Sequence, residues 1–166
     1  MTITDNMNTI TIYTDGSCHT QTKFGAWAAI IIYDDCESII SATEKNTTNN
    51  RMELTAVIKA LEYIEIKHAP LSTVQVFSDS QYVCKLPNRM AKIIKTKFKT
   101  KIGNQRVNSD LLQILFAYLK KYQIHFIKLK AHTRDETSHA KYNRKVDKLA
   151  RSLARAKNEK NGKIDI

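Results

Sequence analysis

The feature that most constrains the fold is the order of the short apolar segments along the chain. Three of them, at 9–14, 26–33 and 38–42, follow one another without a helical pattern in between, which is typical of an antiparallel meander. Two more, at 73–79 and 124–129, come after stretches with helical periodicity, which favours parallel crossovers. The chain is therefore predicted to form an α/β fold, a five-stranded mixed sheet with helices on both faces.

The predicted helices are recognised by apolar residues at intervals of three and four positions. The clearest spans 50–66, where Leu54, Ile58 and Leu61 would share one face. Polar residues at 48–50 precede it and can cap its first turn. The other helices are expected at 80–86, around 90–98, at 110–122 after a capping Ser109, and at 141–156 after a polar loop at 133–140.

The composition fits one domain that stays out of membranes. The chain has 166 residues, 42% of them hydrophobic, and no apolar run reaches the roughly 18 residues of a membrane span. Its start lacks the basic flank and the apolar block of a signal peptide, so a cytoplasmic location is expected. The three cysteines, Cys18, Cys36 and Cys84, include no CxxC pair, which favours reduced thiols over a disulfide framework or a zinc site.

The charge balance points to a polyanionic partner. The chain carries 27 Lys and Arg against 16 Asp and Glu, a formal net charge of +11. The segment 85–106 holds basic residues and no acid. A basic surface can simply keep a protein soluble, but clustering in one window favours nucleic acid as the partner.

Two acids stand where predicted strands end. Asp15 follows the first strand and Asp79 the fourth, and if these strands are parallel neighbours, about 5 Å apart, the carboxylates lie side by side. Either acid alone could be a turn residue or a helix cap. Glu53, in the first turn of a crossover helix, and Asp147, on the last helix, could reach the same place. Carboxylates without matching arginines indicate a site for a hard cation, Mg²⁺ or else Mn²⁺, suited to phosphodiester chemistry.

Four stretches carry a family resemblance. "YTDGSC", "TNNRMEL", "SDSQYV" and "AH…N…VD.LA" occur in this order, and together they resemble type 1 ribonuclease H of the bacterial kind from about residue 9 to residue 155. The resemblance implies a Mg²⁺-dependent endonuclease that hydrolyses the RNA strand of RNA–DNA hybrids and leaves 3′-hydroxyl and 5′-phosphate ends. It also implies the sheet order 3-2-1-4-5 and a protein that acts as a monomer.

The resemblance also assigns roles to residues of this sequence. Asp15, Glu53, Asp79 and Asp147 match the family's metal-binding acids, and His132 matches its loop histidine, thought to move protons or to help product leave. The residues that match hybrid-contacting positions are Gln21, Thr48, Asn49, Asn50, Gln81, Lys95, Lys97, Phe98, Lys99 and Asn143. Among these, Thr48 matches part of a pocket for a DNA-strand phosphate, and the lysines belong to a basic protrusion, residues 85–106.

Several positions depart from the family pattern. Gln21 stands where an asparagine is common, and the loop between His132 and Asn143 is longer than usual and adds His139, so either histidine could serve. The protrusion offers Phe98 in place of tryptophans, which predicts a grip that depends more on charge than on stacking.

The expected organisation is a catalytic domain at 9–156, an N-terminal extension at 1–8 and a charged tail at 157–166. Three alternatives remain open on the sequence: another nuclease or strand-transfer enzyme of the same fold, a hybrid-binding protein without catalysis, and the ribonuclease H portion of a larger reverse transcriptase.

Overall fold

The five predicted strands form one mixed sheet. The structure is a computed structural model that describes residues 9–67, 73–130 and 137–161. The strands are β1 (Ile10–Cys18), β2 (Gly25–Tyr33), β3 (Cys36–Glu44), β4 (Val74–Ser78) and β5 (Ile124–Lys128). Their order is β3-β2-β1-β4-β5, which confirms the predicted architecture.

Strand direction places the carboxyl ends of β1 and β4 at the same edge. β1 pairs antiparallel with β2 and parallel with β4, and the parallel register ends at Tyr13 beside Phe77. β1 does not stop at Asp15 as predicted, because its pairing with β2 continues to Cys18. Asp15 therefore lies within a strand, whereas Asp79 follows directly after the end of β4.

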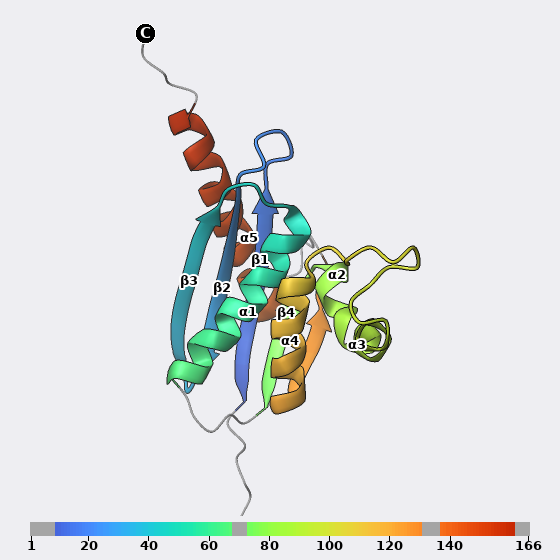
Figure 1. Cartoon of the computed structure of the whole chain (residues 1–166). Coiled ribbons are helices and arrows are strands. Elements are labelled where there is room, and N and C mark those ends of the chain that lie inside the picture. Colours follow the sequence, from blue (N-terminus) through green and yellow to red (C-terminus); the bar gives the residue numbers. More distant parts are fainter. Residues whose placement is uncertain (1–8, 68–72, 131–136, 162–166) are drawn as a thin grey trace, which may run out of the picture.

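Helices cover both faces of the sheet (Figure 1). On one face lie α1 (Asn49–Lys67) and α4 (Ser109–Lys121), which share the larger apolar core with β1 and β4. On the other lies α5 (Ser138–Asn161), which packs on β1 and β2 through a smaller core that includes Val146 and Ala150. The central strands β1, β2 and β4 are thus mostly buried, as their apolar sequences require, whereas the edge strands β3 and β5 remain partly exposed.

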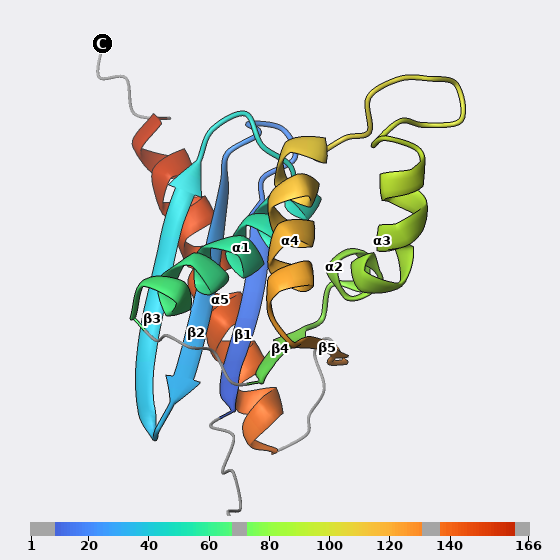
Figure 2. The ribbon, with the colours of Figure 1, turned by 60° about the horizontal axis from the view of Figure 1, so that its bottom comes forward.

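Two short helices extend the fold beyond β4. These are α2 (Gln81–Cys84) and α3 (Leu86–Lys95), and the chain after α3 forms a loop that projects from the body next to α4 (Figure 2). Residues 85–106, the basic protrusion, consist of α3 and this loop. Leu86 and Ile93 anchor α3 to the larger core, so the protrusion is attached through one apolar face and is otherwise open to solvent.

Several helix boundaries differ from the prediction, and α3 spans Leu86–Lys95 where a helix was expected around 90–98. The cap of α4 is Asn108, in a left-handed conformation with φ of 60°, so Ser109 is the first helical residue and not the cap. α5 begins at Ser138, three residues early, since the Thr137 hydroxyl accepts a hydrogen bond from the N–H of Ala140 (3.3 Å). It also runs to Asn161 and takes in part of the expected tail.

Within the part of the chain that the structure describes, no helix is both long and apolar enough to cross a membrane.

Candidate active site

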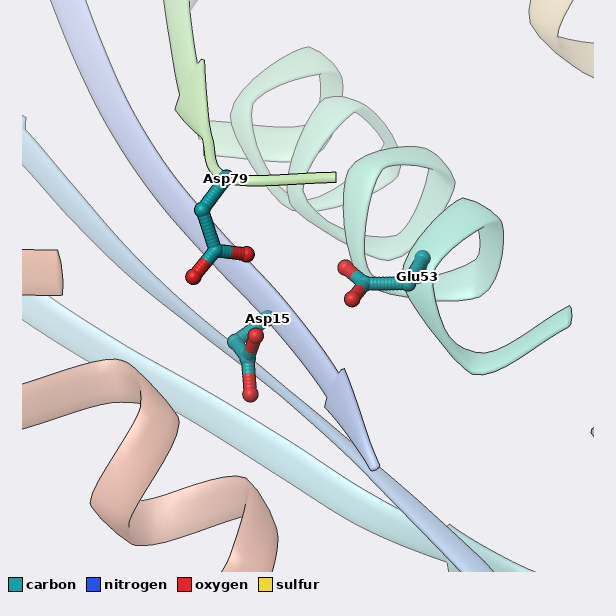
Figure 3. A group of neighbouring side chains, drawn as sticks. All are labelled: Asp15, Glu53 and Asp79. Carbon is teal, nitrogen blue, oxygen red and sulfur yellow. The ribbon is translucent and has the colours of Figure 1, made fainter. Parts of the chain in front are cut away.

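Three acidic side chains meet at the carboxyl edge of the sheet. Asp15 comes from β1, Asp79 from the residue after β4 and Glu53 from the first turns of α1, and the three side chains point toward one another (Figure 3). Each offers a carboxylate oxygen within 4.8 Å of the others. Asp15 and Glu53 are only 4% and 5% exposed, and Asp79 is partly exposed, so most of the cluster is buried.

The approach of α1 to β1 depends on Gly16. A Cβ at this position would lie 2.2 Å from the main-chain nitrogen of Glu53 and 2.4 Å from the carbonyl carbon of Met52. Backbone atoms cannot move aside cheaply, so only glycine lets the helix start press against the strand. Thr48 fixes that start, because its hydroxyl accepts a hydrogen bond from the N–H of Arg51 (3.2 Å). The sequence "TDGS" thus supplies both an acid and the space for its neighbour.

Burial and mutual repulsion raise the proton affinity of the cluster. Burial, followed by the charges of Asp79 and Asp147, raises the pKa of Asp15 to about 8. Burial and then the charges of Asp15 and Asp79 hold the pKa of Glu53 well above its ordinary value. Crowded carboxylates of this kind are stable only with shared protons or a bound cation.

The donor set fits a divalent cation. All three groups offer oxygen ligands, and the Oε2 atom of Glu53 is buried without a hydrogen-bond partner. An orphaned carboxylate oxygen is costly unless something else satisfies it. Hard oxygen ligands of this type suit Mg²⁺ or Mn²⁺.

One stripe of α5 lines the same place. Asn143 is buried, and its amide nitrogen lies 3.4 Å from Oδ2 of Asp79, to which it donates a hydrogen bond. One turn later Asp147 forms an ion pair with Arg151, with 2.7 Å between Oδ1 and Nε. Asp147 and Arg151 line a cavity of about 390 Å³ together with Asp15 and Asp79. The fourth predicted acid therefore borders the cleft, although it is not part of the group within 4.8 Å.

The sequence places this site in a known family. A sequence model of the family described as RNase H matches residues 7–155. The ribonuclease H of Caldicellulosiruptor saccharolyticus is 36% identical over 149 residues, which cover 89% of this chain and 97% of that protein. The chain belongs to the type 1 ribonuclease H family.

Other ribonucleases H extend the comparison. That of Acetivibrio thermocellus is 39% identical over 146 residues, 87% of this chain and 93% of that protein. Among solved structures, LC9-RNase H1, described as a type 1 RNase H with the type 2 active-site motif, superposes with a TM-score of 0.76 at 22% identity. It matches 90% of this chain and 74% of its own. At that identity the likeness concerns the fold alone.

Three of the residues that match hybrid-contacting positions in ribonucleases H line two separate cavities. Asn49 lines the cavity beside the acids, whereas Asn50 and Thr48 line a second cavity of about 420 Å³ between α1, α3 and α4. This second cavity also contains Tyr82 and Asn108, which the sequence had not singled out. The amide of Asn108 donates to the Tyr82 hydroxyl at 3.5 Å. Its left-handed backbone is the one local signal that could have drawn attention to it.

The other residues predicted to contact the hybrid differ in solvent exposure. Gln21 and Gln81 are exposed, and so are Lys95, Lys97 and Lys99 on the protrusion. Phe98 instead turns its ring toward the core, with its centroid 5.9 Å from that of Phe116. The ribonuclease H protrusion therefore presents charge outward and uses its aromatic ring for internal packing.

Of the two histidines of the extended loop, the structure describes only His139. His132 lies outside the described residues. His139 sits in the first turn of α5, where its Nδ1 is 2.7 Å from the Tyr13 hydroxyl and its ring stacks on Phe77 with centroids 4.4 Å apart. Tyr142 stacks on Tyr13 in turn. His139 is thus held in an aromatic stack that anchors the start of α5 against β1 and β4.

Proposed function

We propose that this ribonuclease H hydrolyses the RNA strand of RNA–DNA hybrids and leaves 3′-hydroxyl and 5′-phosphate ends, with Mg²⁺ as its ion and Mn²⁺ as a substitute. The observation that carries the proposal is the buried cluster of Asp15, Glu53 and Asp79 at the sheet edge. Asp15 and Asp79 line a cavity together with the basic side chains Arg151 and Arg155. Acids that can hold metal ions, with cations nearby, suit cleavage of a polyanion.

The residues around the cluster hold the carboxylates in place. Asp15 and Glu53 are held together by the close approach of α1 to β1 at Gly16, and the Asn143 amide donates a hydrogen bond to Oδ2 of Asp79. Asp147 adds a carboxylate at the open side. When bound, divalent ions neutralise the charge of the scissile phosphate and lower the pKa of the attacking water. The low exposure of the acids keeps bulk water from screening these interactions.

Hybrid binding would use the two hollows and the protrusion in different ways. Asn49, Asn50 and the exposed Gln21 and Gln81 are proposed to meet the minor groove, where 2′-hydroxyls distinguish RNA from DNA. Thr48 is proposed to hold a DNA-strand phosphate in the second cavity, next to Asn108. Contacts of these kinds recognise backbone shape and charge and not a base sequence.

The protrusion is proposed to lie along the DNA strand. Lys95, Lys97 and Lys99 are exposed there, and Arg89, Lys92, Lys101 and Arg106 line a further cavity of about 430 Å³ between α3 and its loop. Since the Phe98 ring packs inward, the grip would come from phosphate contacts alone.

We further propose that His132, and not His139, is the functional loop histidine. His139 already has a hydrogen bond to Tyr13 and a stacking partner in Phe77, and it lies two helical turns before Asp147 in α5. A group that helps to move protons or to release product must be able to approach the cleft. His139 is engaged elsewhere.

The proposed setting is a monomer in the cytoplasm. Cys18, Cys36 and Cys84 are all free thiols, which suits a reducing compartment. Sedimentation at micromolar concentration would report a mass near 19.0 kDa for a monomer, and a dimer mass would overturn this part of the proposal.

The decisive experiment compares labelled substrates of one sequence. RNA–DNA hybrid, duplex RNA and duplex DNA are incubated with the full chain, with Mg²⁺ or with EDTA, and Asp15→Asn serves as the control. Cleavage of the RNA strand of the hybrid alone, and only with Mg²⁺, supports the proposal. Cleavage of duplex DNA with the hybrid untouched would favour another nuclease of this fold, and hybrid binding without cleavage would favour a non-catalytic binder.

A further inference from the structure

Arg151 occupies an unexpected place in a cleft built of acids. It lies one helical turn after Asp147 on α5, and the ion pair between them is 2.7 Å long. The Asp147 side chain is 23% exposed and that of Arg151 is 44% exposed. Both line the cavity next to Asp15 and Asp79, and Arg155 lines it one turn further along. The pair therefore lines the same cavity as the acids and is partly exposed to solvent.

Asp147 lies outside the group that the other three acids form. Among the described residues, the group whose carboxylate oxygens lie within 4.8 Å of one another contains Asp15, Glu53 and Asp79, without Asp147. The two partners nevertheless act on the cluster in opposite directions, because the charge of Asp147 raises the pKa of Asp15 and the charge of Arg151 lowers it. Movement of either side chain would change the field at the cluster.

The pair is of a kind that can exchange partners. Ion pairs between partly exposed side chains on one helix are weak, because water and salt screen them. A phosphodiester offers a guanidinium two oxygens in a geometry that it binds in a bidentate manner. A phosphate that enters this cavity would thus compete well for Arg151, and it would leave the Asp147 carboxylate without its cation beside a site that attracts metal ions.

We propose that Arg151 is a positioning residue that couples substrate entry to completion of the metal site. In the resting enzyme it holds Asp147 away from the three-acid cluster, which binds a divalent ion by itself. When a phosphate of the RNA strand enters the cavity, the guanidinium transfers to that phosphate and Asp147 is released to serve as the fourth acid. This inference rests on the proposed function, since it identifies the entering group as a phosphate of the substrate.

The test is calorimetric titration of Mg²⁺ into the full-length protein without nucleic acid. Wild type should show binding at the three-acid cluster. Arg151→Met, which removes the charge and keeps a long side chain that favours helix, should release Asp147 and tighten binding by roughly fivefold, or add a second binding event. Arg155→Met is the matched control, since it removes the same charge from the same cavity and leaves the Asp147 pair intact.

A double-mutant cycle separates positioning from general charge. In an Asp147→Asn background the Arg151→Met change should no longer tighten Mg²⁺ binding, because there is no carboxylate to release. An equal gain in Arg155→Met, or an undiminished gain in the Asp147→Asn background, would show a field effect alone and would overturn the inference. So would an Arg151→Met isotherm that matches wild type.

Failure of this inference can be told from failure of the proposed function. If wild type cleaves the RNA strand of a hybrid but the cycle shows no coupling between Arg151 and Asp147, only the role of Arg151 is overturned. If wild type does not cleave hybrids, the proposed function is overturned and the inference with it. Coupling together with cleavage supports both.

Discussion

The acid cluster and the basic protrusion, which we propose to meet the same substrate, are built in opposite ways. Asp15 and Glu53 are almost completely buried, and their positions are set by main-chain contacts at Gly16. The lysines of the protrusion are exposed on a loop and helix that only one apolar face attaches to the body. The comparison leads us to expect that the positions of the acids are decisive for cleavage, whereas the number of charges on the protrusion matters more for binding than their exact placement.

Asp15→Asn should give the largest effect on the buried side of the comparison. The change removes one carboxylate from the cluster and should lower turnover on the order of 10³-fold, while hybrid binding survives. The measurement is single-turnover cleavage with excess enzyme, together with a binding titration in EDTA. Near wild-type turnover would refute the role assigned to Asp15.

Gly16→Ala should rank second, because it moves an acid without changing any charge. The new methyl would meet the backbone of Glu53, so stability should fall by roughly 1–3 kcal/mol. A displacement of about 1 Å in the cluster can cost about 10²-fold in rate. Urea unfolding and cleavage assays would report the two effects.

Gly103→Ala is the matched control for that variant. Gly103 has φ of +85° and nothing within 4 Å of its would-be Cβ, so the substitution strains the protrusion locally without any clash. The affinity of the Gly103→Ala variant for Mg²⁺ should equal that of wild type. If Gly16→Ala also keeps wild-type Mg²⁺ affinity, then close packing does not set the geometry of the acids.

Substitution of each histidine tests which of the two, His132 or His139, takes part in catalysis. His132→Ala should slow turnover by roughly tenfold to a hundredfold without abolishing it. His139→Ala should leave turnover nearly unchanged and lower stability by about 0.5–1.5 kcal/mol, since it removes a stack on Phe77. The assignment is wrong if His139→Ala is the variant that damages catalysis.

Replacement of Lys95, Lys97 and Lys99 by Ala should have a moderate effect on the exposed side. KM should rise by about tenfold, and the slope of log affinity against log salt should flatten by about one unit per lysine that contacts a phosphate. Turnover at saturation should change little. An unchanged salt slope would remove the protrusion from the binding surface.

The pH dependence of stability tests the electrostatics of the buried side without a change in the substrate. In EDTA the folded state keeps protons on Asp15 and Glu53 that the unfolded chain releases, since the pKa of Asp15 is raised from 3.8 to about 8. The stability from this proton is fully present below about pH 3.8 and is lost as pH rises through about 8. Wild type should therefore lose stability relative to Asp15→Asn between pH 5 and pH 9.

Added Mg²⁺ should reverse that loss at high pH, because ligand binding to the folded state alone stabilises it. Urea unfolding at each pH, with and without Mg²⁺, would follow both variants. A constant difference between wild type and Asp15→Asn across the pH range would contradict the raised pKa.

Much of this arrangement could be predicted from the sequence. The five-stranded mixed sheet follows from apolar patterning, and the convergence of Asp15, Glu53 and Asp79 follows from the acids at two strand ends and in a crossover helix. The strand order came from the family resemblance, whereas these other features are local in sequence, or they follow from strand direction. The same reasoning ended β1 too early, because the continuation to Cys18 depends on a partner strand that patterning alone does not align.

The features that escaped prediction depend on contacts between distant elements. Asn108 stands at the N-cap of α4 in a left-handed conformation and donates a hydrogen bond to Tyr82, and neither residue type reveals this. Phe98 was predicted to contact the hybrid as the aromatic residue of the protrusion, whereas its ring packs toward Phe116. In the sequence Arg151 is one of many basic residues in the last helix, and nothing there distinguishes it. Its ion pair with Asp147 is visible only in the structure.

The central claim is that Asp15, Glu53 and Asp79 together hold a divalent ion, and diffraction from crystals soaked in Mn²⁺ tests it most directly. The account predicts an anomalous peak within ligand distance of all three carboxylates, and its absence from crystals of Asp15→Asn. A fully occupied Mn²⁺ peak elsewhere on the chain, with these three carboxylates left without one, would contradict the account.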